Sequence, residues 1–315
     1  MKYLVTGGAG FIGSTLVHRL CSKGHHVIVI DDLSSGKRGF LPDNVLIEFV
    51  EAKVQDLDIA AIAEIDGIFH LGAQASVPLS IDNFYDSSAN NLLSTLKVFD
   101  WARNQDVPVV YATSSAVYGE LPFGDDGTEA VELGSPYAVD KYVMEKYAHT
   151  CHEHYQLSSV GLRFFNVYGP KQDASNPYSG VISIFIDRLL KGQSVIVNGG
   201  YQTRDFIFID DVVDTLCRAM SHASDQRCCE VLNLGTDVSV TIDDLLASIA
   251  SEIGIEPDVE YRDLPAGDPA VSLGTSKRVA QLLNIDHQQF TPLAEGIKRT
   301  IAYEKKQGSG YEERP

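Results

Sequence analysis

Basic residues are too few in this sequence for a nucleic-acid-binding protein, because 25 Lys and Arg stand against 43 Asp and Glu, for a formal net charge of −18. A nucleic acid or an anionic membrane requires a basic face, so the charge argues against both partners. No apolar run approaches the length of a membrane span, and the chain does not open with a charged segment followed by an apolar one. We therefore expect a cytoplasmic protein without a membrane partner.

Cysteine is scarce as well, and its pattern argues against a metal site. The cysteines show no metal-ligand spacing, and their odd number without a secretion signal favours free thiols. They are Cys21, Cys151, Cys217, Cys228 and Cys229. No histidine pairs convincingly with acids or cysteines at ligand spacing, and His149 and His152 are expected at a surface or an interface. We predict no bound metal.

Glycine, by contrast, is concentrated where the chain begins. Gly7, Gly10 and Gly13 are spaced three apart, between one short apolar run and another. This order is typical of a buried strand, a tight turn and a helix start, where backbone N–H groups bind phosphate because no Cβ atom blocks its approach. Many such turns carry glycine for packing alone, so the motif needs a second signal.

The second signal is a pair of acids at the end of the next apolar run, residues 26–30. Asp31 and Asp32 lie about 20 residues after the turn, where a carboxylate binds the adenosine ribose hydroxyls of a dinucleotide. An acid at that point would repel a 2′-phosphate. The pattern therefore predicts NAD rather than NADP, despite Lys37 and Arg38 close by.

Apolar runs alternate with helical patterns through the first half of the chain. Strands are predicted over 45–50, 67–71, 108–112 and 160–165, and helices over 83–104 and 136–154. Ser135 and Pro136 favour the start of the second helix, since serine caps a helix and proline suits its first turn. The alternation predicts an α/β fold, a doubly wound parallel (Rossmann) sheet that binds ligands at the carboxyl ends of its strands.

The regularity weakens after Gly169 and Pro170, which predicts a smaller C-terminal substrate-binding lobe. Helices are predicted over 181–191, 211–221, 242–253, 276–283 and 292–305, with a strand over 195–197 and a frayed end from Gln307. Residues 1–166 would then form the NAD-binding domain, and the chain would return to this domain over about 203–236. The substrate lobe would comprise 167–202 and 237–315.

Tyr137 and Lys141 are four residues apart and share one face of the predicted helix. An ammonium beside a phenol favours the phenolate, which would lower the pKa of Tyr137 toward the working pH of a general base. The strand over 108–112 leads into Ser114 at the carboxyl end of the sheet, where a hydroxyl can bind a substrate oxygen that becomes a carbonyl. Such a tyrosine–lysine pair is common by chance on exposed helices, so its position beside the glycine turn carries the prediction.

Four motifs together resemble the extended short-chain dehydrogenase/reductases. Within them the chain looks like the nucleotide-sugar 4-epimerases, the group of UDP-glucose and UDP-N-acetylglucosamine 4-epimerases. The motifs are T-G-G-A-G-F-I-G at 6–13, S-S-A-V-Y-G at 114–119, Y-A-V-D-K at 137–141 and R-F-F-N-V-Y-G-P at 163–170. The likeness covers nearly the whole chain and implies a bound NAD that serves as a transient hydride store.

The resemblance also implies roles for single residues. Tyr137 would take the proton of the sugar 4-OH, Ser114 would hydrogen-bond the same oxygen, and Lys141 would hold the nicotinamide ribose. The residues implied in cofactor binding are Gly7, Gly10, Phe11, Ile12, Gly13, Asp31, Asp32, Ser35, Val54, Leu71, Gly72, Ala73, Tyr137, Lys141 and Phe164. Those implied in substrate binding are Ser114, Ser115, Tyr137, Asn166, Arg204 and Ser272.

Several positions separate the reaction from those of related enzymes. Family 4,6-dehydratases place an acidic pair directly after the residue that matches Ser114, whereas this chain has Ser115 and Ala116, so we reject dehydration. Ser272 matches a position where strict UDP-glucose enzymes carry tyrosine. It would leave room for an N-acetyl group, or it is merely exposed on a loop. Arg204 likewise has the alternative of a surface ion pair with Asp205.

Two departures from the family pattern keep alternatives open. Pro265 replaces an arginine that clamps the substrate diphosphate in many relatives, which puts the nucleotide base in doubt, and Lys53 replaces an aspartate that binds adenine, leaving that role to Val54 packing and backbone. The alternatives are another nucleotide-sugar epimerase or reductase, or a non-catalytic NAD-binding regulator. The family resemblance further implies a homodimer, formed by a four-helix bundle of the helices over 83–104 and 136–154.

Overall fold

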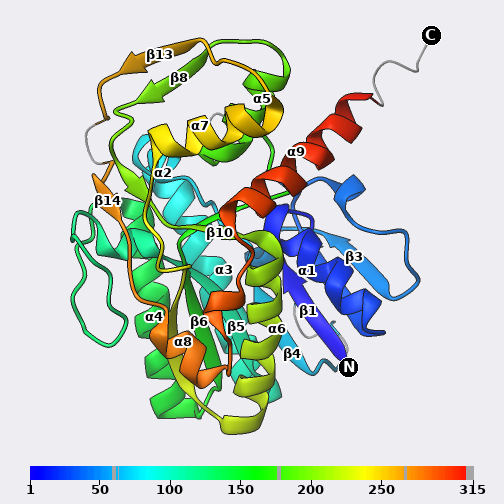
Figure 1. Cartoon of the computed structure of the whole chain (residues 1–315). Helices are drawn as coiled ribbons and strands as arrows, with labels where there is room; N and C mark the ends of the chain where they lie inside the picture. The colour runs from blue at the N-terminus through cyan, green and yellow to red at the C-terminus, as the bar shows by residue number, and fades with distance from the viewer. Residues whose placement is uncertain (59–61, 63, 176–178, 266–267, 310–315) are drawn as a thin grey trace.

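A seven-stranded parallel sheet forms the centre of the protein, in the order β11-β6-β5-β4-β1-β2-β3 (Figure 1). The computed structural model describes residues 1–58, 62, 64–175, 179–265 and 268–309. The strands are β1 (Lys2–Thr6), β2 (His26–Asp31), β3 (Ile47–Glu51), β4 (Gly67–His70), β5 (Val109–Ser114), β6 (Ser159–Phe164) and β11 (Cys229–Leu234). The strand order reverses next to β1, so a crevice is expected at the carboxyl ends of β1 and β4.

Helices cover both faces of this sheet because each strand is apolar on both sides. Neighbouring residues of β1 show this, since Leu4 belongs to one buried cluster and Val5 to the other. The Val5 face packs against α1 (Phe11–Ser22) and α6 (Ile209–Gln226). The Leu4 face packs against α3 (Phe84–Gln105) and α4 (Pro136–Tyr155).

A smaller lobe lies over the carboxyl ends of the strands, toward the top of Figure 1. Its helices are α5 (Val181–Leu190), α7 (Ile242–Ile253) and α9 (Leu293–Ser309), while α8 (Lys277–Leu282) lies beside β11. Its strands pair as β7 (Asn166–Tyr168) with β10 (Phe206–Phe208), β8 (Val195–Asn198) with β13 (Val259–Arg262), and β9 (Thr203–Arg204) with both β12 (Val240–Thr241) and β14 (Val271–Ser272). The α/β doubly wound fold is thus confirmed.

Most predicted helices and strands agree with the structure to within a few residues. Ser135 caps α4 as expected, because its side chain accepts a hydrogen bond from the Ala138 N–H at 3.2 Å. The frayed end predicted from Gln307 is wrong over 307–309, since α9 continues through Ser309, and the rest of that segment lies outside the described residues. The helix α2 (Val77–Asp82) and the strand β11 were not predicted from the sequence. The division into domains stays a prediction.

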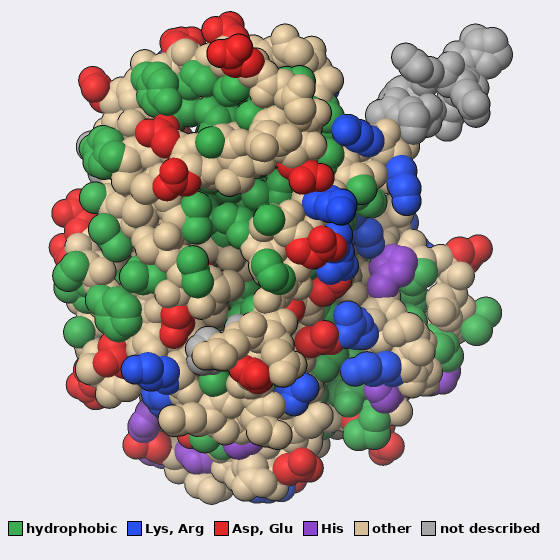
Figure 2. Space-filling model, in the orientation of Figure 1, with side chains coloured by type: hydrophobic (Ala, Val, Ile, Leu, Met, Phe, Trp, Pro, Cys, Tyr) green, Lys and Arg blue, Asp and Glu red, His purple; other side chains and the backbone are tan. Residues whose placement is uncertain are grey.

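The surface agrees with the acidic composition. On the face in Figure 2, Asp and Glu side chains are widely spread, while Lys and Arg gather mainly on the side where α1 and α9 lie. Among the residues that the structure describes, no helix is both long and apolar enough to cross a membrane.

Candidate active site

One large cavity, of about 1180 Å³, opens where the carboxyl ends of β1, β4 and β5 face the smaller lobe. Every residue predicted to bind cofactor or substrate lines it, from Gly7 at the end of β1 to Ser272 in β14. The cavity is therefore long enough to bring both sets of residues together. Their individual roles stay predictions.

The glycine turn between β1 and α1 fits a pyrophosphate. Gly7 has a φ of +66°, and a Cβ atom there would lie 2.7 Å from the backbone of Gly72, so the turn presses against the end of β4. A Cβ atom on Gly13 would overlap the Gly7 carbonyl oxygen. Gly10 stands at the N-cap of α1 without a side chain, which leaves the first N–H groups of the helix to a ligand.

The two acids at the end of β2, Asp31 and Asp32, line the cavity at the place expected for the adenosine ribose. Asp31 accepts hydrogen bonds from the Ala9 and Leu33 N–H groups, both at 2.9 Å, and burial raises the pKa of its carboxyl. Lys37 is turned away into an ion pair with Asp173 at 2.6 Å. The acids thus face the cavity while this nearby base does not line it, an arrangement that suits NAD better than NADP.

A buried chain of hydrogen bonds supports the cofactor half from behind. The Thr6 hydroxyl lies 2.7 Å from His70 Nδ1 and accepts the Gly72 N–H at 3.1 Å. His70 Nε2 lies 3.1 Å from the Thr95 hydroxyl, which itself donates to the Asn91 carbonyl at 2.7 Å. Because the Thr95 hydroxyl donates elsewhere, His70 donates to it through Nε2, and the neutral ring that burial favours accepts through Nδ1 from Thr6. Burial lowers its pKa to about 3.

The same series of hydrogen bonds reaches α4, the helix with the predicted catalytic residues, through Asn91. Its amide accepts the Gln74 N–H at 2.8 Å and donates to Asp140 Oδ2 at 3.1 Å. Asp140 is the neighbour of Lys141 on α4. The segment after β4 is thereby fixed relative to the helix that carries the predicted catalytic residues.

Ser114, Tyr137 and Lys141 lie next to one another in the wall of the cavity. Tyr137 and Lys141 are nearly inaccessible, and the Lys141 ammonium donates to the Ala112 carbonyl at 2.8 Å while lying 5.7 Å from the Tyr137 ring centre. Burial raises the pKa of Tyr137 to about 12, an effect that a hydrogen bond with Ser114 partly offsets. Burial also lowers the pKa of Lys141 to about 8.

The expected lowering of the Tyr137 pKa by Lys141 is therefore wrong for the chain on its own. Desolvation of the phenolate is the dominant effect on the Tyr137 pKa, while the Lys141 ammonium is hydrogen-bonded to the Ala112 carbonyl. A positively charged nicotinamide in the cavity would add the attraction that the chain alone lacks.

The substrate half is built from the smaller lobe. Arg204 forms an ion pair with Asp268 and donates to the Thr203 carbonyl at 2.8 Å, so its suggested pairing with Asp205 is wrong. Asp205 is fully buried and accepts hydrogen bonds from the backbone of Thr236 and of residue 237. Arg204 is consequently left facing the cavity, where it is the register partner of Ser272 between β9 and β14.

Several lining residues were missed by the sequence reading. They are polar residues close to predicted ones, among them Gln74, Asn90, Tyr118, Gln172 and Asp268. Gln74 and Tyr118 could have been inferred, because they follow the predicted strand ends by only a few residues. Gly267, in the loop before Ser272, lies outside the described residues.

Within the described part of the chain, no group of three or more His, Cys, Asp or Glu side chains is placed to hold a metal ion. His149 instead lies 3.5 Å from Glu153 on the exposed side of α4.

Comparison with known proteins gives consistent matches, over most of the chain for a family model and over nearly all of it for single relatives. The model of the NAD dependent epimerase/dehydratase family matches residues 3–235. The UDP-glucose 4-epimerase of Mycolicibacterium smegmatis is 38% identical over 314 residues, covering 96% of this chain and 98% of the relative. A UDP-N-acetylglucosamine 4-epimerase from Methanobrevibacter ruminantium, solved with UDP-N-acetylmuramic acid, superposes with a TM-score of 0.89 at 33% identity, covering 97% and 98% of the two chains. The Thermus thermophilus UDP-glucose 4-epimerase, solved with NAD, has a TM-score of 0.84 at 30% identity, covering 97% and 99%.

Proposed function

The chain belongs to the NAD dependent epimerase/dehydratase family, and from that premise we propose that it inverts C4 of a UDP-sugar, either UDP-N-acetylglucosamine or UDP-glucose. It is an NAD-dependent enzyme of the nucleotide-sugar 4-epimerase type. The observation that carries the proposal is the meeting of Ser114, Tyr137 and Lys141 between the glycine turn and the arginine-bearing half of one cavity.

The chain's own residues would divide the work as follows. Tyr137 takes the proton from the sugar 4-OH, and Ser114 hydrogen-bonds the same oxygen as it becomes a carbonyl. Lys141 holds the nicotinamide ribose, and the positive charge of a bound nicotinamide would favour the phenolate. NAD supplies a transient store for the C4 hydride, so the net redox change is zero. The 4-keto sugar must rotate within the cavity to present its other face, which requires the nucleotide to be held more firmly than the sugar.

Epimerisation is favoured over elimination by the absence of acids next to Ser114. Ser115 and Ala116 both line the cavity, and neither can protonate a leaving hydroxyl group. The alternative of another epimerase or a reductase on the same scaffold would use the same three residues.

The substrate assignment rests on Arg204 and Ser272. Arg204 is 8% exposed and lines the cavity, which suits a diphosphate that displaces Asp268 from it. Ser272 presents a small side chain to the same wall, leaving room for an N-acetyl group. Pro265 also lines the cavity, so no cation is available from the position at which many relatives carry arginine.

The test is turnover of UDP-glucose and UDP-N-acetylglucosamine, each followed by proton NMR at C4. Tyr137→Phe is expected to lower kcat at least about 10³-fold with bound NAD retained, because it removes only the phenol oxygen that accepts the proton as a phenolate. Tyr142→Phe, on the same helix, is the matched control and should retain full activity. Retained NAD without turnover of either sugar by the wild type would instead support a non-catalytic NAD-binding regulator.

We further propose a homodimer formed by α3 and α4. These helices pack side by side on one face of the sheet and leave apolar side chains exposed, including Phe84, Tyr85, Leu93, Val139 and Tyr147. Leu93→Asp should produce a monomer in light scattering, since it places a charge in that surface. Ser22→Asp, exposed at the end of α1, is the control and should leave the mass unchanged.

A further inference from the structure

Two segments that line the substrate half of the cavity are joined to each other by an isolated β-bridge between Gly124 and Gly274. One runs over 119–134, between β5 and α4, and contributes Gly119 and Leu121 to the cavity. The other runs over 271–276 and contributes Ser272 and Leu273. They meet at Gly124, whose N–H donates to the Leu273 carbonyl at 2.8 Å and whose carbonyl accepts the Thr275 N–H at 3.0 Å. We call these two hydrogen bonds the Gly124 joint.

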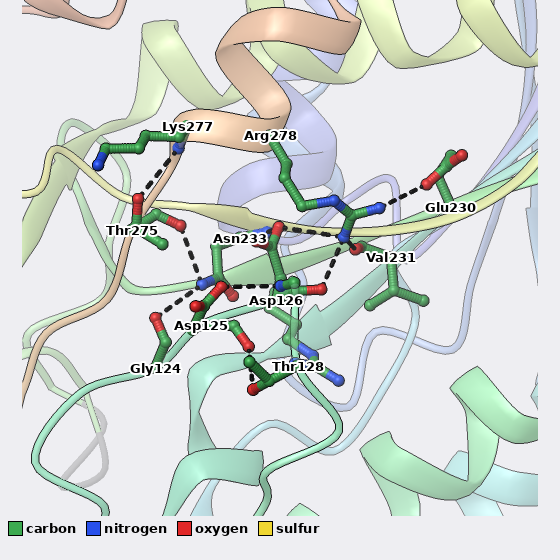
Figure 3. A network of polar contacts seen from close by, with 12 residues as sticks. Gly124, Asp125, Asp126, Thr128, Glu230, Val231, Asn233, Thr275, Lys277 and Arg278 are labelled. Carbon is green, nitrogen blue, oxygen red and sulfur yellow. Dashed lines mark hydrogen bonds and ion pairs between the residues drawn. The ribbon is translucent and has the colours of Figure 1, made fainter.

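Asn233, at the end of β11, holds both sides of the Gly124 joint. Its amide nitrogen donates to the Gly124 carbonyl at 3.2 Å and to the Thr275 carbonyl at 3.1 Å, as Figure 3 shows. Its backbone N–H donates to Asp126 Oδ2 at 2.8 Å. Asn233 is completely buried, so each of these groups would be costly to leave unpaired.

Tyr118 connects Asn233 to the catalytic helix. Its hydroxyl donates to Asn233 Oδ1 and accepts from Arg163 Nη1, both at 2.7 Å. Arg163 binds both carboxylate oxygens of Glu145, one turn after Lys141 on α4, and Glu145 Oε1 also accepts the Thr113 hydroxyl at 2.6 Å. Thr113 precedes Ser114 in β5. An unbroken buried path therefore runs from the catalytic residues to the Gly124 joint.

Close packing keeps the path rigid. A Cβ atom on Gly124 would lie 2.5 Å from carbon atoms of the Tyr118 ring, and one on Gly274 would lie 2.6 Å from Phe165 Cζ. The Tyr118 and Phe165 rings are themselves stacked, 6.5 Å apart. On the outer side, Arg278 donates to the Asp126 carbonyl at 2.7 Å and to the Val231 carbonyl at 3.0 Å (Figure 3).

We propose that Tyr118 and Asn233 are positioning residues that hold the sugar-binding wall in register with Ser114, Tyr137 and Lys141 through the Gly124 joint. The cofactor half does not depend on this path, since the glycine turn is supported separately through Thr6 and His70. The inference rests on the proposed function for its consequence in catalysis, but the joint itself is a property of the chain without substrate.

The experiment combines hydrogen exchange with steady-state kinetics on Tyr118→Phe. Loss of the hydroxyl leaves one N–H of Arg163 and one oxygen of Asn233 without a hydrogen-bond partner. Amide exchange should therefore become faster in peptides covering 119–134 and 271–276 but not in those covering 6–13. The KM for the UDP-sugar should rise about tenfold, with kcat within about twofold of the wild type and bound NAD unchanged. If Tyr118 only stabilised the fold, the variant would have a lower thermal stability without a rise in KM at nearly unchanged kcat.

Two further variants keep the test decisive. Gly124→Ala retains every hydrogen-bonding group but pushes the Tyr118 ring away, and should reproduce the exchange and KM changes. Tyr111→Phe is the control, because the buried Tyr111 hydroxyl has no hydrogen-bond partner among the described residues. Unchanged exchange in both segments, or faster exchange with unchanged KM, would overturn the proposal. If the wild type converts no UDP-sugar, the proposed function fails, and the exchange data alone then decide whether Tyr118 and Asn233 hold the joint.

Discussion

The two halves of the cavity are built from different materials. The cofactor half is made of backbone, packed so closely that Gly7 and Gly13 admit no Cβ atom. The substrate half is made of short strands and loops held together by side chains, such as Arg204 with Asp268 and Asn233 with the Gly124 joint. The backbone wall has no room for an added atom, whereas side chains that form a wall can rearrange around a change. The first half should therefore tolerate less change than the second.

The largest effect is expected where the backbone wall is broken. Gly13→Ala places a methyl group against the Gly7 carbonyl, so we expect loss of bound NAD and about 2 to 3 kcal/mol lower free energy of unfolding. Gly39→Ala is the matched control, since a Cβ atom there meets nothing within 4 Å. Chemical denaturation and the NAD content of the purified proteins measure both effects. Equal NAD content in the two variants would refute the backbone account of the cofactor half.

An acid-dependent effect should follow from His70 behind the same wall. Burial lowers its pKa to about 3 from 6.5, so the unfolded chain takes up the proton first and the stabilising contribution is lost as pH falls from 6.5 toward 3. Between pH 8 and pH 5 the wild type should lose about 2 kcal/mol of unfolding free energy through this group. His70→Gln, which cannot titrate, should lose correspondingly less over that range. Identical pH slopes in urea denaturation would show that His70 is not held neutral.

The smallest effect belongs to the substrate half and should appear only in specificity. Ser272→Tyr fills the wall with a ring, so the ratio of kcat/KM for UDP-N-acetylglucosamine to that for UDP-glucose should fall about tenfold or more. Stability and NAD content should not change. Ser251→Tyr, on the exposed side of α7, is the control. A variant that keeps the wild-type ratio would mean that Ser272 does not face the N-acetyl group.

The difference between the halves also explains what the sequence could predict. The strands and the glycine turn carry local signals, because strands buried on both faces read as apolar runs and the turn needs glycine. The end of β5 and the Tyr137 pair on α4 follow from short motifs. The edge strand β11 was missed because its place beside β6 depends on α6, which precedes it, packing back across the sheet. The pKa of Tyr137 was misjudged because burial cannot be read from spacing.

The substrate half carried weaker signals for the same reason. Arg204 lies next to Asp205 in sequence but pairs with Asp268, and Asp205 turns inward to the backbone near Thr236. The Gly124 joint brings together residues about 150 positions apart, so no local sequence pattern predicts it. Contacts of this kind between side chains can be identified only from the tertiary structure.

The central claim is that a firmly held cofactor half removes and returns the same C4 hydrogen. The most direct measurement is conversion of UDP-N-acetylglucosamine, and separately of UDP-glucose, in deuterated water, followed by proton NMR at C4. The account predicts C4 inversion with no deuterium at C4 and no net reduction of NAD, because the hydride never exchanges with solvent. Deuterium at C4, or no inversion of either sugar by a protein that retains NAD, would contradict it.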